Sequence, residues 1–271
     1  GIGNYTGEFT KTYEITPREY TVTTDGAEKV YDGNPLTAAG RVNNLAKDET
    51  VVLTVTGAQT NVGSSDNTYT LEWKGTAKAS NYKHGKDSIG KLTVTAKPIV
   101  PSDTNGITVT DPLDSTYDGK VHKNKPTVTD TKTNAKLIEE TDYTLTHTGD
   151  LVNVGRVKVT VTGKGNYTGS FELSYQITKR KVSLTSASDE KVYDGNPLTN
   201  SKVTVGKLGF AEKEGATYNV TGTITDVGTK NNTFTYTLNE GTLASNYDIE
   251  THEGTLKVTP VTDKVTVKIS G

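Results

Sequence analysis

The chain contains no cysteine and no methionine in 271 residues, only one tryptophan and four phenylalanines, and no long run of apolar residues. Without cysteine, neither a disulfide framework nor a zinc-thiolate site can form. Without an apolar run of about 20 residues, no transmembrane helix is expected. The 30 basic and 32 acidic residues give a net charge of −2, which provides no polycationic surface for nucleic acid. We therefore expect no nucleic-acid partner and no membrane insertion in this segment.

Threonine is abundant instead, with 50 residues, and tyrosine, with 14, is the main large aromatic residue. Apolar and polar residues alternate with a period of two, which is typical of strands with one buried face. The alternation is clearest in six segments: Tyr20–Val22, Leu53–Val55, Leu92–Val94, Tyr143–Leu145, Val157–Val161 and Phe234–Leu238. Only residues 42–50, 133–141 and 207–217 have room for a helical turn, and none carries an amphipathic stripe. The sequence predicts an all-β protein.

A long internal repeat organises the chain. Residues 28–37 recur letter for letter as 190–199, an offset of 162, and a Gly-Asn-Tyr-Thr-Gly segment at 3–7 recurs at 165–169 with the same offset. A fixed period of this kind indicates an array of similar units. Function is then expected to lie in length and surface rather than in a single active site.

Three short motifs divide this period into units of about 80 residues. Each unit contains a Tyr-Asp-Gly motif, then a Val-Gly pair, then an Asn-Tyr motif and a closing strand. The Tyr-Asp-Gly motifs are Tyr31, Asp32, Gly33, Tyr117, Asp118, Gly119, Tyr193, Asp194 and Gly195, and the Asn-Tyr motifs are Asn81, Tyr82, Asn166, Tyr167, Asn246 and Tyr247. The predicted parts are a closing strand of an upstream module (1–16), first-type sandwich repeats (17–96 and 179–260), a second-type repeat (97–178) and an opening strand of a next module (261–271). We interpret the chain as a window from a longer protein, with any signal peptide outside it.

Several short strands per unit, with no helix of ten or more residues, favour tandem Ig-like β-sandwich modules. A β-grasp unit would need a covering helix, which the pattern lacks. The joints at 13–20 and 175–182 have almost no linker, and the longer joint at 96–106 contains two prolines that fix φ. These joints predict an extended, semi-rigid rod.

The repeated motifs have a structural and a functional interpretation. For Tyr-Asp-Gly we favour a core tyrosine followed by a tight turn, in which Asp accepts from backbone amides and Gly supplies a positive φ. The Asn-Tyr asparagines are expected to cap a turn before a buried tyrosine. Lys29 and Lys191 are the lysines to consider for an isopeptide cross-link, which needs an apolar setting that keeps lysine neutral. The alternating pattern instead makes them solvent-facing.

No catalytic motif is present, and the four histidines are scattered singly, without metal-ligand spacing (His84, His122, His147 and His252). The sequence therefore predicts no enzyme, no cofactor and no metal site.

The motif order also resembles known repeat families. The run from Tyr117-Asp-Gly through Asn153-Val-Gly to Gly165-Asn-Tyr-Thr-Gly and Tyr175-Gln-Ile-Thr resembles the Gly-Asn-Tyr-Thr-Gly repeats of Firmicutes surface proteins. The Val-Tyr-Asp-Gly-Asn-Pro-Leu-Thr segments at 30–37 and 192–199 resemble the YDG/MBG-type repeats of bacterial adhesins. The resemblance implies an extracellular, Ig-like, multi-repeat protein, attached to the Gram-positive cell wall or secreted. It transfers no catalytic or ligand residues.

We therefore expect structural stalk repeats of a cell-surface adhesin or surface filament, which project a binding region from the cell. The expected partners are neighbouring modules of the same chain, other copies of the chain, and a host glycan or protein. The alternative is a ligand-binding adhesin module that contacts host glycan or extracellular protein directly through loops or an edge strand.

Overall fold

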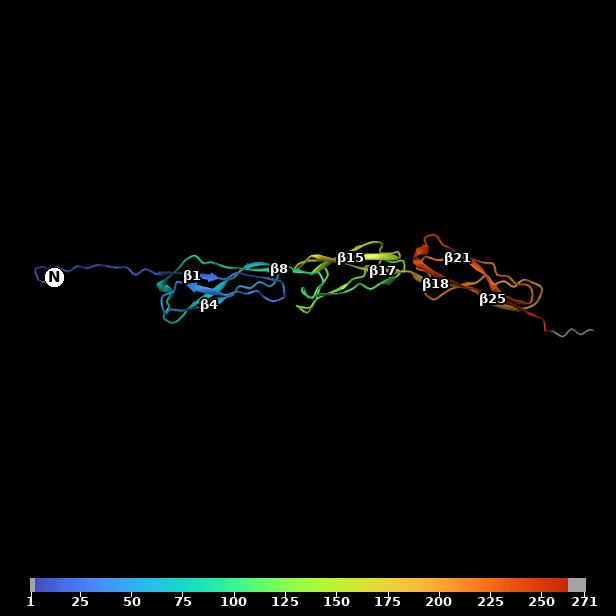
Figure 1. Ribbon diagram of the computed structural model, residues 1–271, viewed down its shortest axis with the longest axis horizontal. Coiled ribbons are helices and arrows are strands. Elements are labelled where there is room, and N and C mark those ends of the chain that lie inside the picture. The colour runs from blue at the N-terminus through green and yellow to red at the C-terminus, as the bar shows by residue number, and fades with distance from the viewer. Residues whose placement is uncertain (1–2, 263–271) are drawn as a thin grey trace, which may run out of the picture. The chain divides into compact units, whose positions relative to one another are not determined.

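The computed structural model describes residues 3–262, and this part of the chain is all-β (Figure 1). Its helical elements are two single 3-10 turns, η1 (Ala79–Asn81) and η2 (Ala244–Asn246). The chain divides into two compact units: unit 1 (Gly1–Thr108, Val128–Thr144 and Thr162–Phe171) and unit 2 (Val109–Thr127, Leu145–Val161 and Glu172–Gly271). Each unit therefore holds one first-type repeat together with one end of the second-type repeat.

The first-type repeat of unit 1 forms three small sheets, of order β3-β1-β7, β2-β8-β5 and β4-β6. Its strands are β1 (Arg18–Thr24), β2 (Ala27–Val30), β3 (Gly40–Asn43), β4 (Val51–Val55), β5 (Gly63–Asp66), β6 (Tyr69–Trp73), β7 (Tyr82–His84) and β8 (Lys91–Thr95). The period of two places Tyr20, Val22 and Thr24 of β1 inward. Strands β1 and β7, and β2 and β8, pair in parallel, whereas β4 and β6 are antiparallel.

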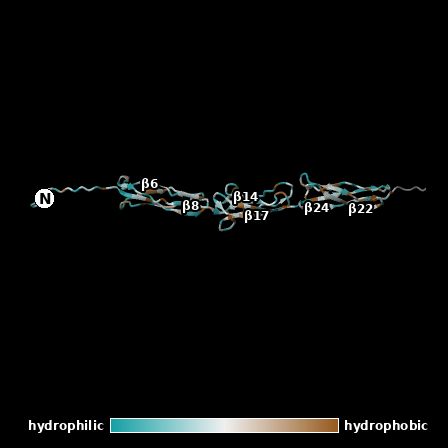
Figure 2. Cartoon of the chain, turned by 90° about the horizontal axis from the view of Figure 1, so that it is seen from above, coloured by the Kyte–Doolittle hydropathy of each residue, from teal (hydrophilic) through white to brown (hydrophobic). Residues whose placement is uncertain are grey.

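The first-type repeat of unit 2 has the same plan, with sheets of order β20-β18-β24, β19-β25-β22 and β21-β23. Its strands are β18 (Arg180–Ser186), β19 (Asp189–Val192), β20 (Val203–Val205), β21 (Ala216–Val220), β22 (Gly228–Asn232), β23 (Phe234–Leu238), β24 (Tyr247–His252) and β25 (Gly254–Thr259). Figure 2 shows apolar residues interleaved with polar ones along the strands rather than gathered in one run.

The second-type repeat combines two long strands, β15 and β17, with several very short ones. Its strands are β9 (Lys97–Pro98), β10 (Ile107–Thr110), β11 (Ser115–Thr116), β12 (Thr127–Asp130), β13 (Ala135–Lys136), β14 (Tyr143–Thr148), β15 (Gly155–Gly163), β16 (Tyr167–Thr168) and β17 (Ser170–Thr178). They form sheets of order β10-β12-β13, β11-β17-β15-β14 and β16-β9.

Each unit has its own apolar core. In unit 1, Tyr20, Val22 and Tyr82 are buried against Trp73 and its neighbours. In unit 2, one cluster of buried residues contains side chains from both the second-type and the first-type repeat: Tyr117, Val157, Val159, Tyr175, Ile177, Val182, Leu184, Ala211 and Tyr247. Because this cluster is shared, the two repeats support one another where they meet in unit 2.

All six strands that the alternating pattern predicted are present, in β1, β4, β8, β14, β15 and β23. None of the three windows considered for a helical turn is helical, and the single turns lie instead at Ala-Ser-Asn, directly ahead of a buried tyrosine. The described residues before β1 form no strand (Figure 1). The predicted opening strand with Val265, Val267 and Ile269 lies outside the described residues.

Candidate functional site at the module joints

Each Tyr-Asp-Gly motif forms the same turn. The tyrosine N–H donates to the carbonyl of the last threonine of the closing strand, at 2.9 Å for Tyr31, 2.9 Å for Tyr117 and 2.8 Å for Tyr193. The aspartate Oδ1 accepts the N–H two residues on, at 2.9 Å in all three turns. The glycines have φ of 80°, 79° and 77°, a left-handed conformation that favours glycine. The turn geometry is thus the one that the sequence predicted.

The three tyrosines differ in burial, and this corrects the prediction that all are core residues. Tyr117 is 3% exposed, Tyr31 is half-buried and Tyr193 is 41% exposed. Tyr31 and Tyr117 each contact the ring of a tyrosine from the next repeat. Tyr193 has no ring partner within residues 3–262, and Val227, from the Val-Gly motif of the same repeat, is 52% exposed. The two tyrosines that contact a ring of the next repeat are the two that are less exposed.

In unit 1 the Asn-Tyr motif of the second-type repeat contacts the end of the 17–96 repeat that bears Tyr31. The rings of Tyr31 and Tyr167 meet edge-on, with centroids 5.7 Å apart. The Oδ1 of Asn166 accepts the N–H of Val62 at 2.9 Å, and its Nδ2 donates to the Oδ1 of Asn61 at 3.0 Å. One amide thus bridges two groups of the preceding repeat.

Unit 2 contains the same joint made from equivalent residues. The rings of Tyr117 and Tyr247 meet edge-on, with centroids 5.5 Å apart. The Oδ1 of Asn246 accepts the N–H of Val154 at 3.0 Å, and its Nδ2 donates to the Oδ1 of Asn153 at 2.8 Å. The three repeated motifs therefore meet at one place, although they are far apart in the sequence.

The asparagines do not cap their own turns, contrary to the prediction. Neither η1 nor η2 has a side-chain cap. Instead, the amides of Asn166 and Asn246 reach residues more than 90 positions away, since an amide can accept and donate at once. Asn81 is exposed, and no partner for its side chain is found within residues 3–262. The Val-Gly and Asn-Tyr motifs both recur in every repeat, but their separation in the sequence does not show that they meet.

The hydroxyl of each Asn-Tyr tyrosine donates to a carboxylate of its own repeat. Tyr82 donates to Glu49 and Tyr247 to Glu214, the latter at 2.7 Å. In unit 2 a second phenol, that of Tyr117, also donates to Glu214. Burial and then the Glu214 carboxylate raise the pKa of Tyr117 to about 12, so at neutral pH this hydroxyl keeps its proton and remains a donor.

A buried ion pair lies beneath the unit 1 joint. Lys97 Nζ is 2.6 Å from Asp130 Oδ1, and the two side chains are 4% and 0% exposed. Tyr167 donates to Asp130 Oδ2 at 3.1 Å, and the N–H of Lys132 donates to Oδ1 at 2.9 Å. Burial alone would raise the pKa of Asp130, but the hydrogen bonds from Lys97 and the backbone outweigh it and hold the pKa below its usual value. The carboxylate is therefore charged and fully satisfied.

The two lysines considered for a cross-link are held by the turns that follow them. Lys29 Nζ lies 2.6 Å from Asp32 Oδ1 and 2.7 Å from the Asn34 carbonyl, and Lys191 makes the equivalent contacts at 2.7 Å. Both side chains are partly exposed, at 21% and 23%. The apolar setting that an isopeptide bond requires is found at neither lysine.

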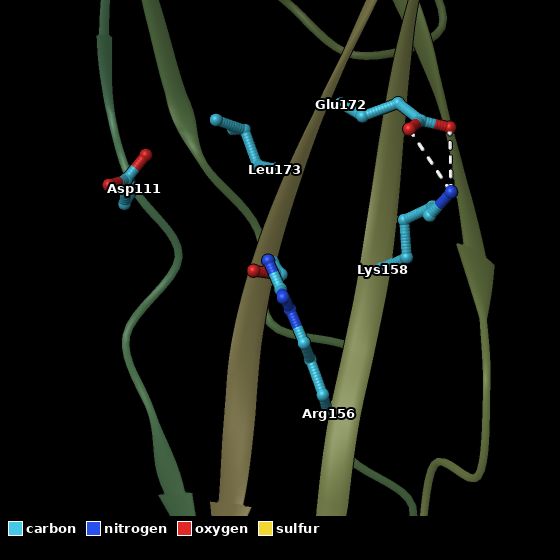
Figure 3. Close-up of a pocket in the computed structure, with 6 residues that line it drawn as sticks. Asp111, Arg156, Lys158, Glu172 and Leu173 are labelled. Carbon is cyan, nitrogen blue, oxygen red and sulfur yellow. Dashed lines mark hydrogen bonds and ion pairs between the residues drawn. The ribbon is translucent and has the colours of Figure 1, made fainter.

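The second-type repeat also carries a surface pocket of about 630 Å³ on β15 and β17 (Figure 3). Lys158 from β15 pairs with Glu172 from β17 at 3.1 Å, and both side chains are more than half exposed. Arg156 lies on the same strand as Lys158 and has no ion-pair partner in residues 3–262. An exposed pair of this kind stabilises little. The pocket lining includes Ser174 but no histidine to activate it.

Within residues 3–262, no group of three or more His, Asp or Glu side chains is placed to hold a metal ion. In the same range, no helix has the length and apolar character to cross a membrane.

Comparison with known proteins yields little. No protein-family model and no curated protein matches the sequence. Among solved structures, the protocadherin GammaB4 extracellular domain aligns with 89% of this chain and 48% of its own, at 11% identity and a TM-score of 0.19. The chain thus spans about half the length of that protein, and a similarity at this TM-score carries no argument about fold or function.

Proposed function

We propose that the chain is a series of Ig-like β-sandwich spacer modules, joined in an extended, semi-rigid rod that projects a binding region of a bacterial adhesin or surface filament. The observation that carries the proposal is the repeated joint. In both units a tyrosine pair and an asparagine bridge tie one repeat to the next. Such contacts restrict bending, because the dihedrals between the repeats cannot rotate without breaking them.

The role proposed is mechanical rather than catalytic. The polar groups at the joints pair with one another, and the carboxylates accept tyrosine hydroxyls. The proposed partners are neighbouring modules and other copies of the chain. The extracellular, wall-attached or secreted location rests on the resemblance of the motifs to Gram-positive surface repeats.

Solution scattering on residues 17–260 tests the proposal. Three modules end to end, each roughly 35–45 Å long with strands that rise about 3.3 Å per residue, give a maximum dimension beyond about 100 Å. A compact domain of this length would instead have a radius of gyration of about 18 Å, and that result would refute the rod. Asn166→Ala and Asn246→Ala should each broaden the distribution of dimensions. Asn81→Ala, which removes no contact made within residues 3–262, is the matched control.

A second candidate function is direct binding of a host glycan or protein. The observation in its favour is the pocket on β15 and β17, where Arg156 has no ion-pair partner among the described residues and can pair with an acidic group of a ligand (Figure 3). Binding of the chain to acidic glycans that Arg156→Ala abolishes, at unchanged melting temperature, would favour this function over a pure spacer.

A further inference from the structure

The 17–96 repeat has an open pocket at the end where β1 begins. The cavity is about 330 Å³, and its lining includes Arg18, Ala46, Glu49, Asn81 and Tyr82. Tyr82 donates to one oxygen of Glu49. For the other oxygen of Glu49 and for the amide of Asn81, no hydrogen-bond partner is found within residues 3–262. The pocket thus presents an acceptor and an amide that are both unused.

Unit 2 contains an equivalent site formed by Arg180, Glu214 and Tyr247. The N–H of Ala46 donates to the Tyr82 hydroxyl at 2.9 Å, and that of Ala211 to the Tyr247 hydroxyl at 3.0 Å. Arg18 Nε, in β1, donates to the carbonyl of Asn44 at 2.8 Å. Likewise, Arg180 Nε, in β18, donates to the carbonyl of Gly209 at 2.6 Å. The two sites are therefore equivalent frameworks.

In unit 2 this site is occupied. Tyr117 of the preceding repeat donates its phenol to Glu214, and its carbonyl accepts from Arg180 Nη1 at 3.4 Å. Asn246 bridges Asn153 and Val154 and is fully buried, at 0% exposure. The occupant is thus the Tyr-Asp-Gly turn and the adjoining Asn-Val-Gly segment of a second-type repeat.

We propose that the pocket at Arg18, Glu49 and Asn81 is a binding site for the Tyr-Asp-Gly end of another second-type module. The phenol of that module donates to the free oxygen of Glu49, and Asn81 bridges its Asn-Val-Gly segment. This inference deepens the proposed spacer function, on which it rests, by naming the partner of one joint surface.

The segment that leads into the pocket, and whose Ile15 and Thr16 line it, identifies which module this is. Residues 3–16 resemble residues 165–178, which include the closing strand of the second-type repeat, with nine of 14 positions identical. Their large side chains are exposed, whereas the counterparts are buried or half-buried: Tyr5 (79%), Phe9 (91%), Tyr13 (87%) and Ile15 (88%) correspond to Tyr167 (5%), Phe171 (half-buried), Tyr175 (2%) and Ile177 (1%). The occupant is the module of the same polypeptide that residues 3–16 complete as its closing strand.

The first test uses the chain as it is. Asn246→Ala should lower the urea midpoint of unit 2, because it removes the asparagine bridge of an occupied joint. Asn81→Ala should leave the midpoint of unit 1 unchanged, because its site is empty. A clear loss of stability from Asn81→Ala in this chain would overturn the proposal, since it would show that the amide already has a partner.

The second test fills the site. Residues 97–164 are added directly ahead of Gly3, which restores an uninterrupted second-type repeat because Gly3 corresponds to Gly165. Trp73 is the chain's only tryptophan, and its ring lies 4.9 Å from that of Tyr82, so its fluorescence reports on the pocket. In the extended chain we expect a shift of Trp73 emission and slowed hydrogen exchange at residues 3–16. Asn81→Ala should now lower the midpoint as Asn246→Ala does, and Tyr117→Phe in the added copy should reverse part of the shift.

The remaining outcomes are decided as follows. If the added residues fold, as exchange at 3–16 would show, and Asn81→Ala remains neutral, the proposal is wrong. If they do not fold, p-cresol is titrated into the original chain: a saturable change in Trp73 emission that Glu49→Gln weakens supports a phenol site, and no saturable change overturns it. Concentration-dependent association of the original chain that Asn81→Ala abolishes would make a second copy the occupant and refute this assignment, while the scattering test of the spacer function stands independently.

Discussion

The stability that a tyrosine contributes at a joint depends on how many groups it contacts there. Tyr117 is buried, contacts the ring of Tyr247 and donates to Glu214, whereas Tyr193 has the same turn but is 41% exposed. We predict that Tyr117→Ala lowers the free energy of unfolding by about 3–5 kcal/mol, as aromatic truncation in a core does, and that Tyr193→Ala lowers it by about 1 kcal/mol or less. Urea unfolding of the two variants measures the difference, and equal losses would contradict it.

The ion pair of Lys97 and Asp130 in unit 1 is buried, so loss of either charge leaves the other without a partner. Asp130→Asn leaves a buried ammonium without its counter-charge, and we predict a loss of about 3–5 kcal/mol. The exposed pair of Lys91 and Asp66, whose side chains are 67% and 55% exposed, provides the control. Asp66→Asn should change stability by about 1 kcal/mol at most. Chemical denaturation of both variants would show similar losses only if Asp130 were not buried in solution.

The same groups predict how stability depends on pH. The pKa of Asp130 is lower in the folded chain than in the unfolded chain, where it is about 3.9. Its contribution is therefore present above about pH 4 and is lost as the pH falls through the folded pKa. The pH dependence that Tyr117 contributes has the opposite sign, since its pKa of about 12 in the folded chain exceeds the unfolded value of 10.0. Its contribution is present below pH 10 and is lost as the pH rises towards 12.

Denaturation midpoints recorded across the pH range test both signs. Asp130→Asn should flatten the acid limb of the profile and Tyr117→Phe the alkaline limb, each without altering the other limb. An acid limb that keeps its slope in Asp130→Asn would assign the acid sensitivity to other carboxylates.

Among the elements, two chain crossings beside buried asparagines leave no room for a side chain. A Cβ built on Gly57 would lie 2.5 Å from the Cα of Asn67, and one built on Gly222 would lie 2.5 Å from the Cα of Asn232. We predict that either glycine-to-alanine change destabilises its repeat by about 1–3 kcal/mol, through forced backbone displacement. Gly155 at the start of β15 is the control, because no atom lies within 4 Å of its Cβ position. Thermal unfolding should show Gly155→Ala unchanged or slightly stabilised.

The elements were largely predictable from local pattern, whereas their contacts were not. Alternation of period two located strands such as β1 and β15, and Asp-Gly located the turns with positive φ. The joints were missed because the amide of Asn246 acts on Val154, 92 residues away, and nothing next to the asparagine marks that distance. The burial of Tyr117 and the exposure of Tyr193 were equally hidden, since both motifs read Tyr-Asp-Gly.

At the scale of the whole molecule, the compact units and the repeats divide the chain differently. The core of unit 2 includes Val157 and Tyr175 of the second-type repeat beside Leu184 of the first-type repeat. We predict two cooperative unfolding steps rather than three. Hydrogen exchange under mild denaturant should show residues 109–127 exchanging together with 179–260, and residues 128–144 together with 17–96. Three separate steps that follow the repeats would contradict this, and Asn246→Ala should partly uncouple unit 2.

The shared design of the joints has a genetic consequence. Each joint is built from parts that recur with the repeat, and residues 28–37 and 190–199 are identical. Duplication of the DNA that encodes one 162-residue period copies every residue that a new joint needs, from both of the repeats that meet there. Such an array can gain or lose pairs of repeats by recombination between similar copies, without any new interface having to evolve. Loss of a single repeat would instead place two repeats of one type in succession, so we expect alleles of such a gene to differ in length by whole pairs.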